Sequence, residues 1–419
     1  MKFLIISLLL LRLLPLSAQE AERMRNEQLG SVYFAYPTPT GTMSPILEGY
    51  EPVYISHYGR HGSRWMTNDV RYLQVKGVLD SLYCVDELTE LGKDVRTRIH
   101  KVWADAEGKS GSITPLGERQ MREIAERMML HFPTLFRGEA VIDARSSTSL
   151  RAAISMSYFT ERLKELNPSL QVSRRAYHSY MDYIAHTDAQ GEAFSAEDAP
   201  WRKEIFQEFE GRKIQPQRLM ESLFKRPEAI ADPTDLMRSF FWIAADMQNV
   251  ELKNVSFYDL FTYEELYGIW ETVNARMYVC NANAPMARGL MVGQARNLLR
   301  NIIESSEAVL QGKDATRAHL RFGHDTHLIR LLALMQVEGC CNAETDIEKF
   351  DEVWNDFRVA PMGGNLQLIF FRNAQGNVLV KLLLNEQEAK LPLQAVHGTY
   401  YDWSSAKTFF LQRLEEHQK

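Results

Sequence analysis

The sequence has no excess of basic charge, no second long apolar run and few cysteines. Its net charge of −6 over 419 residues argues against nucleic acid as a partner, since phosphate backbones require a basic protein face. After the amino-terminal residues no stretch approaches the ~20 apolar residues of a membrane-spanning helix. No Gly-rich loop ending in Lys and Ser or Thr is present, which argues against a nucleotide cradle. No obligate protein partner is evident.

The four cysteines do not form a zinc pattern. Buried free thiols and one structural disulfide both remain open as interpretations, and the adjacent pair is poorly placed to bridge itself. We therefore expect no metal and no other cofactor. The residues concerned are Cys84, Cys280, Cys340 and Cys341.

The amino terminus has the pattern of a secretory signal peptide. Lys2 precedes an apolar run over 3–14, and small residues follow up to Ala18. We predict a signal peptide over 1–18 and export to the periplasm or the medium. The polar, then Tyr- and Pro-rich residues 19–49 are predicted to form an irregular lead-in segment.

The rest of the chain alternates strand and helix patterns, with one interruption. Short apolar strands precede helices in 50–170, and the rhythm resumes in 310–419, which predicts an α/β domain whose central sheet is flanked by helices. Helical segments dominate 171–309, which we interpret as a mostly helical cap inserted into that domain. An independent helical domain is the alternative.

Three turns that carry charge follow strand patterns and precede helix patterns. They contain Arg60-His61-Gly62-Ser63-Arg64, Arg145, and His324-Asp325. Ligands of open α/β sheets bind beyond the carboxyl ends of the strands, where helix amino termini favour anions. One sheet could therefore bring all three turns into a single phosphate site.

The residue types suggest how such a site would act. A neutral imidazole at His61 can attack phosphorus if nearby cations stabilise the equatorial oxygens. Asp325 is the carboxylic acid that can protonate the leaving group, which predicts activity on the acid side. The predicted ligand is an anionic phosphomonoester, held by Arg60, Arg64, Arg145 and His324.

Two other interpretations compete with this one. The Arg-His-Gly turn alone could be a solvated basic turn, since short motifs are weak indicators. His324, Asp325 and His327 could bind a metal, although residues at a strand-to-helix junction point in different directions and no carboxylate cluster supports them.

These residues resemble the histidine phosphatase superfamily in its acid phosphatase and phytase branch. Arg60-His61-Gly62-Ser63-Arg64 is similar to the Arg-His-Gly-x-Arg signature, and His324-Asp325 to the late His-Asp pair. Longer stretches over residues 50–395 look most like multiple inositol-polyphosphate phosphatases: Thr114-Pro-Leu-Gly to Phe136, Ala144-Arg-Ser-Ser-Thr148, Leu236-Met-Arg-Ser-Phe240, Leu320-Arg-Phe-Gly-His324 and Leu382-Leu-Leu-Asn-Glu386.

The resemblance implies a phosphoglycerate-mutase-like mixed sheet, a phosphohistidine on His61, proton donation by Asp325 and no metal. Two positions depart from the family pattern. Met66 stands where the signature usually has proline, and Asp325 stands where inositol-polyphosphate phosphatases usually carry the glutamate of His-Ala-Glu. The predicted function is an exported acid phosphatase acting on inositol phosphates such as phytate. The alternatives are a broad or sugar-phosphate phosphatase and an exported phosphate-binding protein without catalysis.

Overall fold

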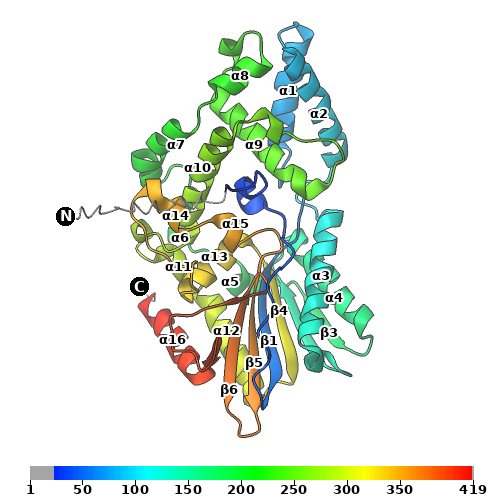
Figure 1. The fold of residues 1–419 in the computed structure, drawn as a ribbon, viewed down its shortest axis with the longest axis vertical. Helices are drawn as coiled ribbons and strands as arrows, with labels where there is room; N and C mark the ends of the chain where they lie inside the picture. The colour runs from blue at the N-terminus through cyan, green and yellow to red at the C-terminus, as the bar shows by residue number, and fades with distance from the viewer. Residues whose placement is uncertain (1–22, 418–419) are drawn as a thin grey trace, which may run out of the picture.

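An eight-stranded mixed sheet forms the centre of the computed structural model, which describes residues 23–417 (Figure 1). The strand order is β3-β2-β4-β1-β5-β6-β7, and β8 pairs with β6. Neighbours among β1 to β4 are parallel, whereas β1-β5 and the pairings of β6 are antiparallel. The strands are β1 (Tyr50–Arg60), β2 (Val141–Ser146), β3 (Gln171–Arg175), β4 (Thr316–Gly323), β5 (Asn365–Asn373), β6 (Val378–Leu384), β7 (Gln387–Ala389) and β8 (Tyr400–Asp402).

Helices cover both faces of this sheet, which confirms the predicted α/β class. One face packs against α3 (Pro115–His131) and α4 (Leu150–Leu166), and the other against α12 (Arg296–Leu310), α13 (Asp325–Leu334) and α16 (Trp403–Glu416). The core beneath α3 and α4 is aliphatic and aromatic, and includes Ile55, Ile142, Phe159, Leu320 and Phe322.

Local sequence explains where α3 begins and how β5 and β6 connect. The Thr114 hydroxyl accepts a hydrogen bond from the Gly117 amide, and Pro115 occupies the first helical position, as predicted for this helix start. The predicted β5–β6 hairpin is confirmed by its antiparallel pairing. Its turn contains Gly376 at φ 87°, a conformation that glycine adopts without strain.

The remaining helices form a second, helical part above the carboxyl ends of the parallel strands (Figure 1). Its longest members are α9 (Pro233–Val250) and α10 (Tyr263–Asn281). Around them lie α1 (Val70–Cys84), α2 (Glu90–Ala106), α5 (Met181–Ile184), α6 (Ala189–Ser195), α7 (Gln207–Lys213), α8 (Gln217–Leu223), α11 (Leu290–Gly293), α14 (Phe350–Val353) and α15 (Asp356–Val359).

The helical part does not coincide with the expected cap over 171–309. Helices α1 and α2 pack against α9 and α8, although they precede that range. Residues 171–175 form the edge strand β3, and α12 packs on β1 and β4. The helical part is therefore assembled from several stretches of chain. The periodicity of apolar residues along a helix does not by itself reveal which face of that helix meets the sheet.

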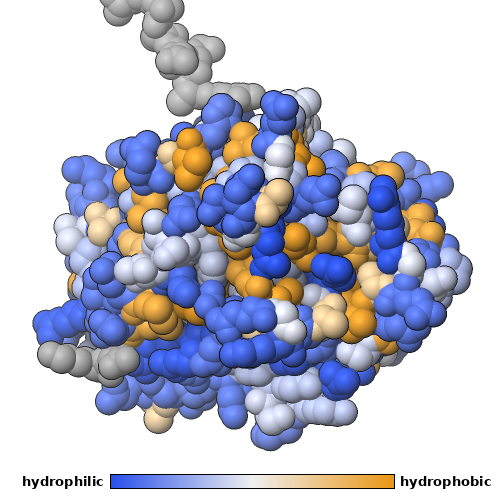
Figure 2. Space-filling view, turned by 90° about the horizontal axis from the view of Figure 1, so that it is seen from below, coloured by the Kyte–Doolittle hydropathy of each residue, from blue (hydrophilic) through white to orange (hydrophobic). Residues whose placement is uncertain are grey.

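The surface and the termini add little to the site. Seen from the end that carries the β5–β6 hairpin, hydrophilic side chains cover most of this face and apolar ones lie between them (Figure 2). Within 23–417 no helix has the length and apolarity needed to cross a bilayer. All four cysteines are free thiols. The predicted signal peptide lies outside the described residues.

Candidate functional site

The Arg-His-Gly turn leaves β1 at the carboxyl edge of the sheet, between β4 and β5. The Arg60 amide donates to the carbonyl of Gly364 at 2.8 Å, and the His61 amide donates to that of Gly323 at 3.2 Å. The Gly363 amide donates to the His61 carbonyl at 2.9 Å. Two separate stretches of chain, one at Gly323 and one at Gly363-Gly364, thus fix the backbone around His61 at the end of the parallel strands.

Gly62 lets this turn pack directly against the amino terminus of α3. A Cβ at this position would lie 2.6 Å from the Gly117 carbonyl oxygen, closer than real contacts allow. The Gly62 amide donates to the Ser155 hydroxyl of α4 at 3.1 Å. The glycine of the motif is therefore required by close approach between two backbones.

Hydrogen bonding fixes the tautomer of His61. Its Nδ1 lies 2.9 Å from the Gly62 carbonyl oxygen, which can only accept, so Nδ1 carries the proton and Nε2 keeps its lone pair. Burial, together with Arg60 and Arg64, lowers the pKa of His61 well below its usual range. The imidazole is therefore neutral and has an unprotonated Nε2, as a nucleophile requires.

Three arginines lie around His61 with donors unused. Arg60 Nη1 donates to the carbonyls of Val32 at 2.5 Å and Ala360 at 2.8 Å. Among the residues the structure describes, the buried Nε of Arg60, Arg64 and Arg151 have no hydrogen-bond partner. Buried N–H groups are nearly always paired, so three free ones beside one imidazole are what an oxyanion would satisfy.

His324 and Asp325 complete the cluster at the end of β4. The His324 ring lies 5.8 Å from the His61 ring between centroids, and its Nε2 is 3.1 Å from the Ser147 hydroxyl. Burial and the neighbouring Arg151 lower the pKa of His324 to about 4. The predicted convergence of the first and third turns is therefore present in the fold.

Asp325 forms an ion pair inside this cluster. Its Oδ2 lies 2.9 Å from Arg60 Nη2. Burial acts to raise the pKa of Asp325, but Arg60 and His324 outweigh it and leave the pKa below the usual value. Without a bound anion, the carboxyl is therefore ionised over most of the pH range.

The structure does not bring Arg145 into the cluster, contrary to the sequence prediction. Its Nη2 lies 2.6 Å from Asp143 Oδ2, and its Nη1 donates to the Tyr183 hydroxyl at 3.2 Å. Arg145 pairs with Arg321 in the register of β2 and β4, on the side of the sheet where Asp143 and Tyr183 lie. Strand alternation thus turns this guanidinium away from His61.

Arg151 lies in this cluster, although the sequence analysis did not predict it there. It is the second residue of α4, and its Nη2 lies 3.4 Å from His324 Nδ1. Arg145-Ser-Ser-Thr-Ser-Leu-Arg151 is one strand-to-helix turn with an arginine at each end. The sequence feature that could have identified Arg151 is an arginine in the first turn of a helix, where a bound anion would lie at the helix amino terminus.

The metal interpretation of His324, Asp325 and His327 finds no support in the geometry. His327 Nε2 donates to the His186 carbonyl at 2.6 Å, which directs the ring away from the cluster. Within 23–417 no three His, Cys, Asp or Glu side chains are grouped as metal ligands.

Met66, at the position of the expected proline, is buried next to Asp246, whose carboxyl accepts a hydrogen bond from the Tyr72 hydroxyl at 2.6 Å. The turn after Arg64 is further held by the Gly111 amide, which donates to the Met66 carbonyl at 2.7 Å.

Helix α9 is joined to the turn by side-chain hydrogen bonds. The Ser63 hydroxyl donates to Asn249 Oδ1 at 2.7 Å, and Asn249 Nδ2 donates to the Tyr33 carbonyl at 2.9 Å. The Tyr33 hydroxyl in turn accepts from Arg64 Nη1 at 3.2 Å. The helical part therefore supports one side of the site.

Comparison with protein families gives one match. The model for the histidine phosphatase superfamily (branch 2) matches residues 60–385, which include His61, Arg151 and Asp325. No curated protein sequence matches the chain.

Solved structures share this fold at low identity. The multiple inositol polyphosphate phosphatase of Bifidobacterium longum, in complex with inositol hexasulfate, has 17% identity and a TM-score of 0.77, over 91% of this chain and 97% of that one. The phytase of D. castellii has 14% identity and a TM-score of 0.63, over 93% and 85%. The phytase of Hafnia alvei with tartrate has 14% identity and a TM-score of 0.56, over 89% and 100%. At these identities the likeness concerns the fold.

Proposed function

The chain belongs to branch 2 of the histidine phosphatase superfamily, and from that premise we propose that it hydrolyses phosphomonoesters through a phosphohistidine on His61. The observation that carries the proposal is the free Nε2 of a neutral His61 beside three arginines with unpaired donors. A nucleophile and an oxyanion site are thereby combined at one point of the fold.

In the first step His61 Nε2 attacks phosphorus, the N–P bond forms and the bond from phosphorus to the ester oxygen breaks. Donors from Arg60, Arg64 and Arg151 stabilise the charge on the equatorial oxygens. Asp325 gives its proton to the leaving oxygen, which departs as an alcohol.

In the second step a water molecule attacks the phosphohistidine and its proton passes to the Asp325 carboxylate. The N–P bond breaks, inorganic phosphate forms, and His61 and the protonated Asp325 are regenerated. Because Asp325 must be protonated to act as the acid, we expect activity on the acid side of neutrality.

The nucleophile assignment can be tested by trapping the intermediate. Wild-type protein is mixed with a phosphomonoester labelled at phosphorus and quenched in alkali, and the label is located by mass spectrometry. We expect it on His61 and expect His61→Ala to lose at least about a thousandfold in turnover. The surface variant His131→Ala is the control. Label on another residue, or substantial turnover by His61→Ala, contradicts the assignment.

For the substrate we propose inositol phosphates such as phytate. The proposal is supported by the fold shared with a phosphatase crystallised with inositol hexasulfate. A panel of inositol phosphates, sugar phosphates and p-nitrophenyl phosphate, scored for phosphate release in EDTA, separates this proposal from a broad or sugar-phosphate phosphatase. Binding without release from any ester would instead leave a phosphate-binding protein.

We also propose that the protein is exported, on the basis of the pattern over residues 1–18. Amino-terminal sequencing of the protein recovered from the periplasm or medium should begin at Gln19. Recovery of the chain from the cytoplasm with residues 1–18 still attached contradicts export.

A further inference from the structure

Two neighbouring residues of the amino-terminal segment contact the two arginines of the Arg-His-Gly turn. Arg60 Nη1 donates to the Val32 carbonyl at 2.5 Å. Arg64 Nη1 donates to the Tyr33 hydroxyl at 3.2 Å, and Arg64 Cζ lies 4.8 Å from the centroid of the Tyr33 ring. Val32 and Tyr33 end the 3-10 helix Gln28–Tyr33, which precedes the residues that the family model matches. One short segment thus supplies an acceptor to each arginine.

These contacts occupy the same nitrogen in both guanidiniums and leave another one free. Arg60 Nη1 has a second acceptor in the Ala360 carbonyl at 2.8 Å, and Arg64 Nη1 has one in the Trp65 carbonyl at 3.0 Å. The Nε of each arginine is buried and has no hydrogen-bond partner among the described residues. Since a guanidinium binds an oxyanion through parallel donors, the amino-terminal segment determines which donors of each fork remain for that anion.

The segment contains a strained residue directly before these acceptors. Ser31 has φ 60° and ψ −141°, a region of backbone space that is essentially restricted to glycine. Such strain persists only where the surroundings enforce it. Ser31 is fully buried, and its hydroxyl donates to Asp356 Oδ2. Asp356 Oδ1 in turn accepts from the Trp270 indole at 3.1 Å, so the partner of Ser31 is itself fixed.

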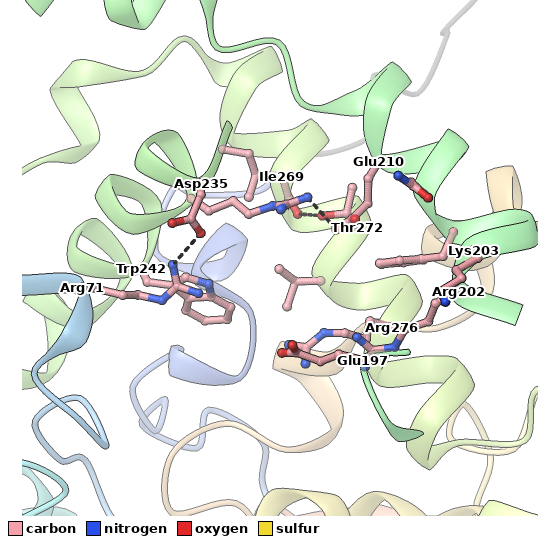
Figure 3. Close-up of a pocket in the computed structure, with 14 residues that line it drawn as sticks. Arg71, Glu197, Arg202, Lys203, Glu210, Asp235, Trp242, Ile269, Thr272 and Arg276 are labelled. Atoms are coloured by element: carbon pink, nitrogen blue, oxygen red, sulfur yellow. Dashed lines mark hydrogen bonds and ion pairs between the residues drawn. The ribbon is translucent and has the colours of Figure 1, made fainter. Parts of the chain in front are cut away.

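Further contacts hold the segment from two sides. The Tyr33 carbonyl accepts from Asn249 Nδ2 of α9 at 2.9 Å, and the Phe34 carbonyl accepts from the Met362 amide at 2.8 Å. In Figure 3 the Trp242 indole of α9 lies beside the pale blue ribbon of this segment, and its ring centroid is 5.0 Å from that of Tyr33. The segment is therefore fixed between α9 and the loop that leads into β5.

We infer that residues 28–36 are part of the phosphate site, in which Tyr33 is a positioning residue that acts through Arg64. This inference rests on the proposed function, because the anion concerned is the phosphoryl group that His61 would attack. A mobile arginine loses conformational freedom when it binds an anion, whereas Arg64 is already oriented by its contacts with Tyr33. The Tyr33 hydroxyl accepts from Arg64 and takes no part in the proton transfers of the reaction.

The test is whether Tyr33 acts through Arg64, measured as kcat/KM for p-nitrophenyl phosphate in a double-mutant cycle. Tyr33→Phe keeps the ring and removes the acceptor, so kcat/KM should fall about tenfold. In the Arg64→Gln background the same change should have almost no effect, because the group that Tyr33 positions is absent. An equal fall in both backgrounds overturns the inference, and so does an unchanged kcat/KM in Tyr33→Phe alone.

Tyr401→Phe is the matched control for stability. Tyr401 is buried in β8, and its hydroxyl accepts from the Leu391 amide at 2.8 Å. Each variant removes a hydroxyl from a buried tyrosine, so thermal unfolding should show similar losses of stability. We expect Tyr401→Phe to keep the wild-type kcat/KM. A fall as large as that in Tyr33→Phe would mean that the effect comes from stability, and it would overturn the inference.

Binding measured without catalysis separates this inference from the proposed function. Calorimetric titration of inorganic phosphate should show an affinity about tenfold weaker in Tyr33→Phe than in wild type. If Tyr33→Phe does not fold, Ser31→Gly is used in its place with the same expectations, because glycine adopts this backbone conformation without strain but lacks the anchoring hydroxyl. Wild-type protein that releases phosphate from no ester refutes the proposed function. Phosphatase activity with equal phosphate affinity in wild type and variant refutes the positioning role alone.

Discussion

Arg60 and Asp325 are ion-paired, with Nη2 and Oδ2 2.9 Å apart, so a proposed phosphate ligand and the proposed proton donor hold one another before substrate arrives. Burial acts to raise the pKa of Asp325, and Arg60 is the charge that does most to keep it low. An incoming oxyanion competes for Arg60 and adds negative charge beside the carboxyl. Both effects raise the pKa of Asp325, so substrate binding itself prepares the acid.

We therefore expect anion binding to be accompanied by proton uptake. Sulfate suits the test because it takes up no proton itself in mildly acidic buffer. Calorimetric titration of sulfate into the protein, in buffers of different ionisation enthalpy, measures the protons bound. The wild-type protein should take up part of a proton, and Asp325→Asn should take up none. Equal uptake by both would remove Asp325 from this role.

Asp325→Asn should also reveal the acid step through the leaving group. Alkyl phosphates need a proton on the departing oxygen, so their turnover should fall about 100- to 10,000-fold. Activated aryl phosphates such as p-nitrophenyl phosphate leave as stable anions and should lose far less. The measurement is kcat for both ester classes. Equal losses would mean that Asp325 acts on phosphate binding and not on the leaving group.

Arg151 and Arg145 offer a direct comparison between the structural and the sequence-based assignment. Arg151→Gln should lower kcat/KM for p-nitrophenyl phosphate about 100-fold, since it removes an oxyanion donor. Arg145→Gln removes the partner of Asp143 and should lower the free energy of unfolding by about 1 kcal/mol. Its kcat/KM should change much less. The reverse pattern would restore the sequence prediction.

Asp246 should make the stability depend on pH. Burial raises its pKa to about 7, while Tyr72 and Arg64 act to lower it. The pKa of Asp246 is higher in the folded protein than in the unfolded chain, so its contribution to the free energy of unfolding is complete below the unfolded pKa of ~4. This contribution is lost as the pH rises through about 7. Thermal unfolding of wild type should show Tm falling between these pH values, and Asp246→Asn should flatten that decline. An equally steep decline in the variant would contradict the assignment.

Gly62 and Gly77 form a matched pair for testing the close approach at the Arg-His-Gly turn. Gly62→Ala forces a Cβ against the Gly117 carbonyl and should cost about 1–3 kcal/mol in unfolding free energy, together with most activity. Gly77 lies within α1 with open space around its Cβ position. Gly77→Ala should stabilise the helix by about 0.5–1 kcal/mol and keep activity. Urea unfolding measures both, and a tolerated Gly62→Ala would exclude the steric argument.

The sequence predicted the parts of the site that are encoded locally. The turn at His61 and the pair His324-Asp325 each combine an apolar strand, a break and a helix, so their place at the sheet edge follows from pattern alone. The choice between Arg145 and Arg151 does not follow from the pattern. It depends on which face of β2 the Arg145 side chain leaves and on where the first turn of α4 places Arg151. A single residue of register reverses the face of a strand from which a side chain leaves.

The helical part was harder to predict for a different reason. Helices α1 and α2 have the patterns of ordinary surface helices, and nothing local distinguishes packing against α9 from packing against the sheet. A cavity between α1, α9 and α10 likewise gathers basic residues from separate segments: Arg71, Arg202, Lys203, Arg238 and Arg276. Only the assembled fold places their charges in one hollow.

The hydrogen bond from Ser63 to Asn249 has a consequence for how this chain can be altered. Because α9 carries an acceptor for the Arg-His-Gly turn, the helical part is not an exchangeable module. A chimera that imports it from another phosphatase would have to reproduce this acceptor at the same point of α9.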